Sequence, residues 1–542
     1  MSQYLVGLAA RSIQRYVFAS NRLVDIIGAS ALVEELFDAE KLRHDFGPLN
    51  TEVLTSQGGS ATLLVTGDTP PTDGVACFSR RRLITAPGVE ADVQILTHQT
   101  GSLAEELLLL GAKLTEASAA PTTSVPHPAG AGFASCRATG GAASGIDPRT
   151  HTPLSRQAAA ARQRGLAEAD RRGTPLPTPL HNWSAIEPTE LDHLGRTSGQ
   201  RSLIGVVHID GNGIGAKIER WLQGAKDLAD AEFIAQLVGW STDLSLCTDA
   251  AWEEVRQLTE AAIHEKFDGG SLQLRGEVED LNFGLVEQAG GAGRKSTFLP
   301  IRKILQGGDD LTFVCEGRIA LSLAVAATTA FGEHVAGTLG PVSACAGVAL
   351  VHSHSPFVRA YDLANQLCEN AKQAFSGEAA LDWQLGLLEP GQSLAEARKP
   401  LLPGLTCRPY RLQSDAPHRS WAALDELLLG TDPGGDSLRS PQWSAVGAKV
   451  RTFPALARRG PDVLASELRA WRIVDNRLSL PPPYQTNGFA TSDGKTSTPL
   501  LDAVELLSRH QQLRPFAASA QDTDRQDGEQ LPFGERFQAG RP

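Results

Sequence analysis

Apolar residues form two similar series of short runs along the chain. The first series starts at residue 4 and the second near residue 203, and each opens with an apolar run of strand length followed by a helical pattern. Each series continues with two strand-like runs around a Gly-Gly pair, a further helical stretch and a fourth strand-like run. Glycine tolerates the positive φ of tight hairpin turns, so both pairs predict hairpins. The pattern therefore indicates an internal duplication.

The predicted order of elements in each copy is β-α-β-β-α-β. The hairpin and the fourth strand occupy residues 51–65 and 88–96 in the first copy, and residues 299–315 and 342–351 in the second. This is the order of the ferredoxin-like split βαβ, in which helices cover one face of an antiparallel sheet. We therefore expect an α+β fold with two ferredoxin-like domains.

The pattern changes outside the two copies, and these changes set the predicted domain boundaries. A stretch rich in Ala, Gly, Pro and Ser predicts a connector, a helical pattern follows the second copy, and the polar C-terminus predicts disorder. In chain order the segments are the first copy at 1–115, the connector module at 116–200, the second copy at 201–385 with an insertion at about 225–297 that includes a helix at 250–267, the helical C-terminal domain at 386–515 and the tail at 516–542.

Three carboxylates of the second copy form the strongest candidate site. The first strand ends at Asp210, and the Gly-Gly pair leads into Asp309 and Asp310. Adjacent central strands of the predicted sheet would bring these side chains together. Clustered carboxylates are electrostatically costly unless they hold hard cations such as Mg²⁺ or Mn²⁺. Two such ions activate a 3′-hydroxyl and neutralise the leaving pyrophosphate of a nucleoside triphosphate.

A glycine-rich turn adds a second signal for a nucleotide. After Asp210 the chain opens from a strand into a helix, and this type of backbone can cradle phosphates. Both motifs also have a simpler interpretation, because Gly and Asp are common in hairpin turns and Gly permits close packing of a strand against a helix. Their joint occurrence in the correct order favours a metal–nucleotide site. The residues assigned to the nucleotide are Gly211, Asn212, Gly213, Gly307 and Gly308.

These motifs resemble a known family, the large polymerase-cyclase subunit of type III CRISPR effector complexes, which makes cyclic oligoadenylates. The resemblance covers residues 1–515 and rests on residues 13–30, the Asp-Gly-Asn strand end, the Gly-Gly-Asp-Asp turn and residues 356–364. It implies two palm domains, a two-metal site on the three aspartates, and condensation of ATP into cyclic or linear oligoadenylate signals for antiviral defence. It also implies guide RNA and CRISPR effector subunits as partners, and a downstream effector activated by the cyclic nucleotide.

Three further residues are assigned through resemblance. The helix ending at Lys372 is similar to a helix end of GGDEF-type diguanylate cyclases, where the lysine contacts the triphosphate; without the palm context, a solvated surface lysine is the simpler interpretation. The first copy carries Gly58-Gly59-Ser60-Ala61 where an active copy would carry acids. We expect this copy to bind no metal and to complete the nucleotide pocket across the interface, with Ser30 and Asn21 as contributors.

The chain also departs from the family pattern. Asn212 stands where the family often has a second aspartate, which leaves one charge fewer for the metal and predicts weaker or more Mn²⁺-dependent activity. The segment that binds zinc in the family is reduced to Cys136 with Thr139 at the place of a second cysteine, so no zinc is expected. His44 and Asp45 lack the other ligands of an HD nuclease site, and the resemblance is to a form without that domain.

Composition narrows the choice of function only slightly. The 542 residues include 41% hydrophobic ones, as in an ordinary globular protein, and the net charge of −12 neither establishes nor excludes an RNA partner, since local basic patches bind phosphates. The sequence lacks a signal peptide and an apolar run long enough to cross a membrane, so we expect a cytoplasmic location and no membrane partner.

Two other functions stay open at this stage. The chain could be a non-catalytic scaffold subunit of an RNA-guided effector complex, although the intact Asp210, Asp309 and Asp310 argue against pure scaffolding. It could also be a dinucleotide cyclase that uses GTP, which palm chemistry permits. Base specificity, product ring size and linkage, the activating ligand and the oligomeric state are left open as well.

Overall fold

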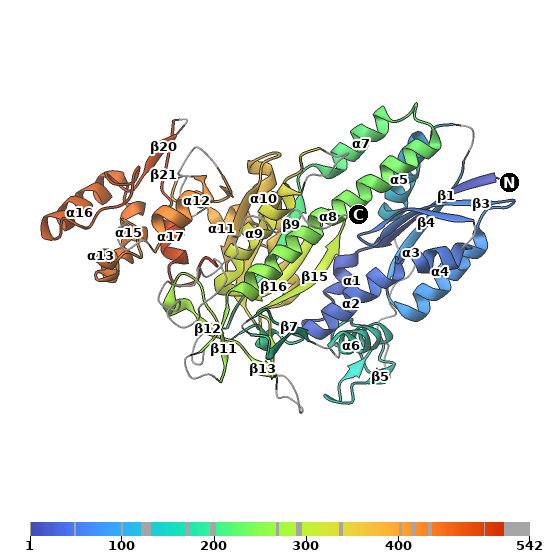
Figure 1. The fold of residues 1–542 in the computed structure, drawn as a ribbon, viewed down its shortest axis with the longest axis horizontal. Helices are drawn as coiled ribbons and strands as arrows, with labels where there is room; N and C mark the ends of the chain where they lie inside the picture. Colours follow the sequence, from blue (N-terminus) through green and yellow to red (C-terminus); the bar gives the residue numbers. More distant parts are fainter. Residues whose placement is uncertain are drawn as a thin grey trace, which may run out of the picture.

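Two sheets, each covered by helices, make up the centre of an α+β fold (Figure 1). The computed structural model describes residues 2–513 apart from 48–49, 99–100, 121–131, 170–172, 179, 196–201, 267–269, 289–294, 335–339, 400, 402–403, 414–418, 432–435 and 493. The predicted tail at 516–542 and parts of the predicted connector lie outside the described residues.

The first sheet has the strand order β2-β3-β1-β4, with all pairs antiparallel. Its strands are β1 (Ser2–Arg11), β2 (Thr51–Gln57), β3 (Ser60–Gly67) and β4 (Glu90–His98). Alternate residues of a strand face opposite sides. Val6 therefore packs with the helices α2 (Leu23–Leu36) and α4 (Thr72–Thr85), whereas Leu5 packs with α5 (Leu103–Ala119) on the other face. Burial on both faces explains the uninterrupted apolar run of β1.

The second sheet has six strands in the order β15-β16-β9-β17-β18-β19. The strands are β15 (Ile301–Gly307), β16 (Asp310–Glu316), β9 (Leu203–Gly211), β17 (Ala344–His352), β18 (Ala380–Leu385) and β19 (Tyr410–Arg411). The first four repeat the relative order of the first sheet, while β18 joins β17 in parallel. The helices α9 (Ala320–Glu333) and α10 (Phe357–Ala374) pack against this sheet.

One apolar core joins the two sheets. Val6 of β1 and Val206 of β9 belong to the same buried cluster. At its centre, the ring of Phe18 lies 5.5 Å from that of Phe357 and 4.4 Å from that of Tyr361, measured between centroids. The two duplicated regions therefore share a continuous apolar interface.

A helix of 32 residues, α8 (Asp230–Ala261), runs across both sheets (Figure 1). It lies within the predicted insertion but begins well before the helix expected there. The side chain of Gln57 donates to the backbone oxygen of Ser241 at 2.7 Å, and Thr248 Oγ1 donates to the backbone oxygen of Gly308 at 3.2 Å. The helix thus contacts the hairpin turns of both sheets.

The connector contributes one long helix, α6 (Arg156–Ala169), which packs against α2. A Cβ atom added at Gly28 would lie 1.8 Å from the backbone oxygen of Ala161, and one added at Gly165 would lie 1.8 Å from that of Val24. Only glycine permits this close approach of two helices. Arg162 of α6 also pairs with Asp25 of α2.

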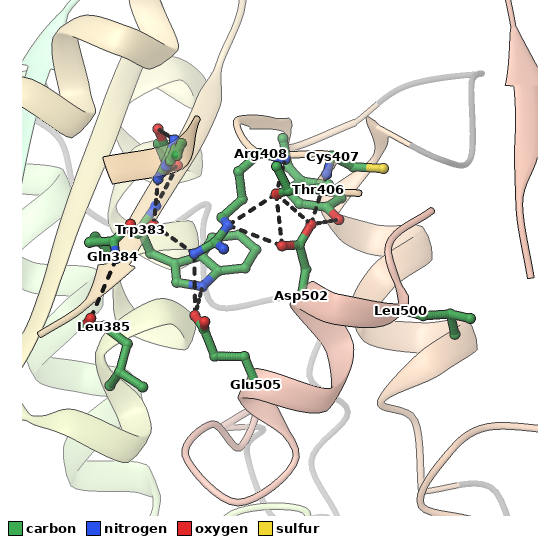
Figure 2. Close-up of polar contacts among 12 residues, drawn as sticks. Trp383, Gln384, Leu385, Thr406, Cys407, Arg408, Leu500, Asp502 and Glu505 are labelled. Carbon is green, nitrogen blue, oxygen red and sulfur yellow. Dashed lines mark hydrogen bonds and ion pairs between the residues drawn. The ribbon is translucent and has the colours of Figure 1, made fainter. Parts of the chain in front are cut away.

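The C-terminal helices attach to the second sheet through a buried ion-pair network (Figure 2). Asp502, on α17 (Leu500–Leu506), accepts hydrogen bonds from Thr406 Oγ1, the Cys407 amide and the Tyr410 hydroxyl, each at 2.8 Å. Arg408 Nε lies 3.0 Å from the same carboxylate. A fully buried carboxylate is tolerated only with such partners, so this network fixes α17 against the sheet edge.

The remaining elements are shorter or peripheral. The other helices are α1 (Ile13–Val17), α3 (Ala39–Phe46), α7 (Ile214–Gly224), α11 (Leu394–Arg398), α12 (Trp421–Ala423), α13 (Pro441–Ser444), α14 (Gly447–Val450), α15 (Phe453–Arg458) and α16 (Pro461–Val474). The other strands are β5 (Gly145–Ile146), β6 (Pro153–Leu154), β7 (Thr174–Pro175), β8 (Trp183–Ile186), β10 (Ile263–Glu265), β11 (Leu272–Leu274), β12 (Phe283–Gly284), β13 (Glu287–Gln288), β14 (Lys295–Phe298), β20 (Ala490–Ser492) and β21 (Lys495–Ser497). Among the described residues, no helix is long and apolar enough to cross a membrane.

Candidate functional site

The structure brings the three predicted aspartates together. Strands β9 and β16 pair antiparallel with Asp210 directly opposite Asp310. Asp309 precedes Asp310 in the hairpin turn, and its backbone oxygen accepts a hydrogen bond from the Gly211 amide at 3.1 Å. A Cβ atom added at Gly211 would lie 2.9 Å from the Cβ of Asp309. The carboxylates thus occupy one end of the two central strands, as the topology predicts.

Burial and mutual repulsion perturb two of these carboxylates. Burial, reinforced by the charge of Asp210, raises the pKa of Asp309 to about 6. Burial, with the charges of Asp210 and Asp309, raises the pKa of Asp310 to about 7. Asp309 and Asp310 are therefore partly protonated near neutral pH. A neighbouring positive charge would stabilise their ionised forms.

Lys372 supplies such a charge from the last turn of α10. Its Nζ donates to a carboxylate oxygen of Asp210 and, at 2.9 Å, to the backbone oxygen of Gly211. Burial lowers the pKa of Lys372, but the hydrogen bond and charge of Asp210 outweigh burial, and the net shift is upward. The ammonium group therefore stays charged beside the aspartates.

The three aspartates fit the donor chemistry of a hard divalent cation. Their oxygens are the ligands that Mg²⁺ and Mn²⁺ prefer, and the raised pKa values of Asp309 and Asp310 record a repulsion that a cation would relieve. In the part of the chain that the structure describes, no group of three or more His, Cys, Asp and Glu side chains is already arranged to hold a metal ion. Asp210 is instead paired with Lys372.

The glycine-rich turn after β9 exposes backbone at the start of α7. Gly213 adopts a φ of 64° and caps this helix, a conformation that favours glycine. Asn212 is buried, and its Nδ2 donates to Ser343 Oγ and to the backbone oxygen of Glu378, both at 2.9 Å. The amide of Asn212 thus binds protein groups, so its side chain is engaged away from the aspartates.

The Gly-Gly turns of the two sheets touch each other. A Cβ atom added at Gly307 would lie 2.5 Å from the Cα of Gly58. Cavities of about 580 Å³ and 330 Å³ lie beside this contact, and Gly58, Gly307, Gly308 and Asp310 line both. The larger is within the range of about 300–1,000 Å³ typical of small-molecule sites.

Two residues predicted to complete the pocket from the first copy have different positions. Ser30 lines the larger cavity from α2. Asn21 does not line it; its Oδ1 accepts a hydrogen bond from the Phe357 amide at 3.1 Å and so caps α10. The resemblance placed both residues in one motif, but only Ser30 faces the cavity.

Several lining residues were not predicted. Glu34 lies one helical turn after Ser30, and this i, i+4 spacing could have placed both on one helix face. Lys303 comes from β15, opposite α2, and Tyr361 from α10. Thr248 comes from α8, whose approach to both turns has no signal in the local sequence.

Comparison with known proteins agrees with this architecture. No protein-family model and no curated protein sequence matches the chain. Among solved structures, the apo Csm1-Csm4 cassette and a Csm1-Csm4 cassette in complex with pppApApA each match with a TM-score of 0.51 and 14% identity, over 94% of this chain and 70% of that chain. The chain has the fold of Csm1. A structure of Csm1 in T.onnurineus matches with a TM-score of 0.48 and 12% identity over the same shares.

The Csm1 fold confirms the predicted resemblance to the large subunit of type III CRISPR effector complexes at the level of fold. The identity of 14% fits a divergent form. The predicted α+β class is confirmed as well, with several sheets and many helices.

Proposed function

We propose that this Csm1-like chain condenses ATP into cyclic or linear oligoadenylates, and that its two sheets are the two ferredoxin-like palms of such an enzyme. One observation carries the proposal: Asp210, Asp309, Asp310 and Lys372 come together at the turn of the second sheet, where Asp310 lines a cavity of about 580 Å³ and Asp309 lines the smaller one. Perturbed acids next to a cavity between duplicated regions are typical of a catalytic site.

In this proposal the charge of each side chain determines its role. Asp210, Asp309 and Asp310 would hold Mg²⁺ or Mn²⁺, which neutralises the triphosphate and makes the attacking hydroxyl more acidic. Lys372, which pairs with Asp210 in the structure, would donate to a triphosphate oxygen. The backbone of Gly213 and the first amides of α7 would orient the phosphates, whereas the Gly211 amide already donates to the Asp309 backbone oxygen. The 3′-oxygen bonds to the α-phosphorus as the bond to pyrophosphate breaks.

The neighbours support the substrate and one class of partner. One Csm1-Csm4 cassette was solved with pppApApA, a linear product of the type proposed. By analogy we expect this chain to bind a subunit similar to Csm4, and a guide RNA within a larger complex. The segment boundaries at 115, 200 and 385 are part of the same proposal, although β19 extends the second sheet past residue 385.

The test is a synthesis reaction with each labelled nucleoside triphosphate in Mg²⁺ or Mn²⁺. Products are identified by mass spectrometry beside an Asp309→Ala/Asp310→Ala variant. We expect a metal-dependent oligoadenylate that the variant does not make. No product from the chain alone or with RNA and partner subunits, despite bound ATP, would refute the proposal.

A scaffold role is the second candidate, and one observation favours it. Lys372 forms an ion pair with Asp210, and no metal-binding group is preformed in the described part of the chain. A scaffold would bind nucleotide without turning it over, so the same synthesis reaction separates the two functions.

A further inference from the structure

The larger cavity has two facing walls of different origin. Ser30, Val33 and Glu34 come from one face of α2, since residues three and four apart share a helix face. Lys303 and Leu305 come from β15 of the other sheet. The apolar side chains between the polar ones make a slot suited to a flat ring with polar edges.

Glu34 lines this slot and is exposed to solvent. Solvent reaches the side chain through the open side of the cavity, while the surrounding walls remove enough water to raise its pKa. No basic group in the described part of the chain forms an ion pair with Glu34 within 4.0 Å, yet the charge of Lys303 still acts on it and partly offsets the upward shift. The charges of Glu34 and Lys303 therefore interact within one cavity without forming an ion pair.

Lys303 is held in place on its side of the cavity. Its Nζ donates to Gln306 Oε1 at 2.7 Å and lies 5.8 Å from the ring centroid of Trp252. These contacts leave further donor capacity on the ammonium group, which has three N–H bonds. The slot thus offers an acceptor on one wall and a donor on the other.

We propose that Glu34 reads the base of the bound nucleotide by accepting a hydrogen bond from the 6-amino group of adenine, while Lys303 donates to a ring nitrogen. The inference rests on the proposed function and names the base that the site selects. Hypoxanthine, the base of inosine, carries an oxygen at position 6. That oxygen would face the Glu34 carboxylate without a proton between them, so the site would reject it.

The test measures binding with nucleotides that cannot condense. The 3′-deoxy forms of ATP, inosine triphosphate and GTP lack the attacking hydroxyl, and their Kd values are measured by calorimetry in Mg²⁺. Because turnover is not the readout, a chain that binds adenine selectively but makes no product would refute the proposed synthesis and still support this inference.

Two isosteric variants at the same cavity test whether the preference for adenine depends on Glu34. Glu34→Gln keeps the shape but adds a donor that can face an oxygen at position 6. Asp38→Asn removes the same charge from the same cavity, and asparagine can still cap α3, where Asp38 accepts from the Lys41 amide at 3.0 Å.

The wild type should bind the adenine nucleotide roughly ten- to hundredfold more tightly than the inosine nucleotide, the usual discrimination of a paired base contact. Glu34→Gln should reduce the ratio to within about threefold, and Asp38→Asn should keep it. Four results would overturn the inference: an unchanged ratio in Glu34→Gln, an equal loss in Asp38→Asn, tighter binding of the guanine nucleotide, or no binding by the wild type.

Discussion

The hairpins of the two sheets share a strand order but differ at the residues that form their turns. In the first sheet Gln57 pairs with Ser60, so Gly58 and Gly59 form the turn. In the second sheet Gly307 pairs with Asp310, so the turn is formed by Gly308 and Asp309. The motifs therefore match with an offset of one residue in structure.

Backbone angles account for the difference between the turns. Both glycines of the first turn have positive φ, 58° at Gly58 and 75° at Gly59. In the second turn Gly308 has a φ of 60°, whereas Asp309 is not among the described non-glycine residues with positive φ. A turn with one positive φ accepts a side chain at its second position without strain. That change admits the carboxylate of Asp309.

Strand pairing extends the comparison to the neighbouring strands. Ser60 pairs with Ala9 of β1, as Asp310 pairs with Asp210 of β9. On the other side of Ala9, Asp92 of β4 is held by Arg11, with Arg11 Nε donating to Asp92 Oδ2 at 2.6 Å. The first sheet thus retains the framework of the site and lacks its charges, so the proposed chemistry would depend on three side chains rather than on the fold.

The largest expected effect comes from removing the two aspartates that distinguish the second turn from the first. Asp309→Ala/Asp310→Ala should reduce oligoadenylate synthesis at least about 100-fold, since metal-bound carboxylates contribute several kcal/mol to the transition state. Adding Gly59→Asp/Ser60→Asp to this variant should not restore activity, because Ala9 stands in place of Asp210. Product formation is measured by mass spectrometry. Restored synthesis would show that aspartates in the turn of the first sheet can replace those of the second.

A smaller loss should follow from removing Lys372, which pairs with Asp210. Lys372→Met should raise KM for ATP roughly 10- to 100-fold, the worth of a charged hydrogen bond of about 1.5–3 kcal/mol. Steady-state kinetics measures the change. The control is Lys226→Met, which removes a surface lysine that lies 3.0 Å from Glu105 and should leave KM unchanged.

The contact between the turns is tested by adding one methyl group. Gly307→Ala would place its Cβ against the backbone of Gly58 and should destabilise the protein by about 1–3 kcal/mol, the usual cost of overpacking. Gly111→Ala, in open space on α5, should instead be neutral or slightly stabilising. Urea unfolding compares the two, and equal stabilities would mean that the turns separate freely.

The smallest effect concerns the dependence of stability on pH. The pKa of Asp310 rises from its ordinary 3.8 to about 7 on folding, so between these values the folded protein holds a proton that the unfolded chain releases. Stability is therefore lost as the pH rises through this window. Asp310→Asn removes the loss and should raise Tm by about 1 °C at pH 8, which corresponds to about 1 kcal/mol in a protein of 542 residues.

The measurement is a thermal melt in chelator at pH 4 and pH 8. The gain from Asp310→Asn should disappear at pH 4, where the wild-type carboxyl is protonated in the folded protein. A gain of the same size at both pH values would contradict the link to charge. Added Mg²⁺ should stabilise the wild type more than the variant, since a bound ligand shifts the folding equilibrium.

The convergence of the aspartates was accessible from the sequence because strand order and hairpin pairing determine it. The one-residue offset between the turns could not be predicted. An alignment of the two Gly-Gly pairs by sequence matches Ser60 to Asp309, whereas the strand pairing in the structure matches Ser60 to Asp310. The role of Asn212 was equally hidden, because its partners Ser343 and Glu378 lie far along the chain. Tertiary contacts of this kind leave no local pattern.

The predicted insertion shows a related limit. The helical pattern predicts a helix at 250–267, whereas α8 begins at Asp230 and ends at Ala261. Its buried residues, such as Leu237 and Leu244, face the two sheets. Which surfaces a helix packs against depends on residues elsewhere, so neither its role beside the turns nor its wall of the cavity could be read from its own periodicity.

The glycine contact between α2 and α6 also bears on how the chain is made. During synthesis, Gly28 leaves the ribosome long before Gly165, its partner in the helix crossing. One face of α2 therefore stays uncovered until α6 has been synthesised and can pack against it, because domains fold as their contacts become available. A chain stopped at residue 115 would keep that apolar face exposed and should aggregate, so the connector helix belongs to the folding unit that precedes it.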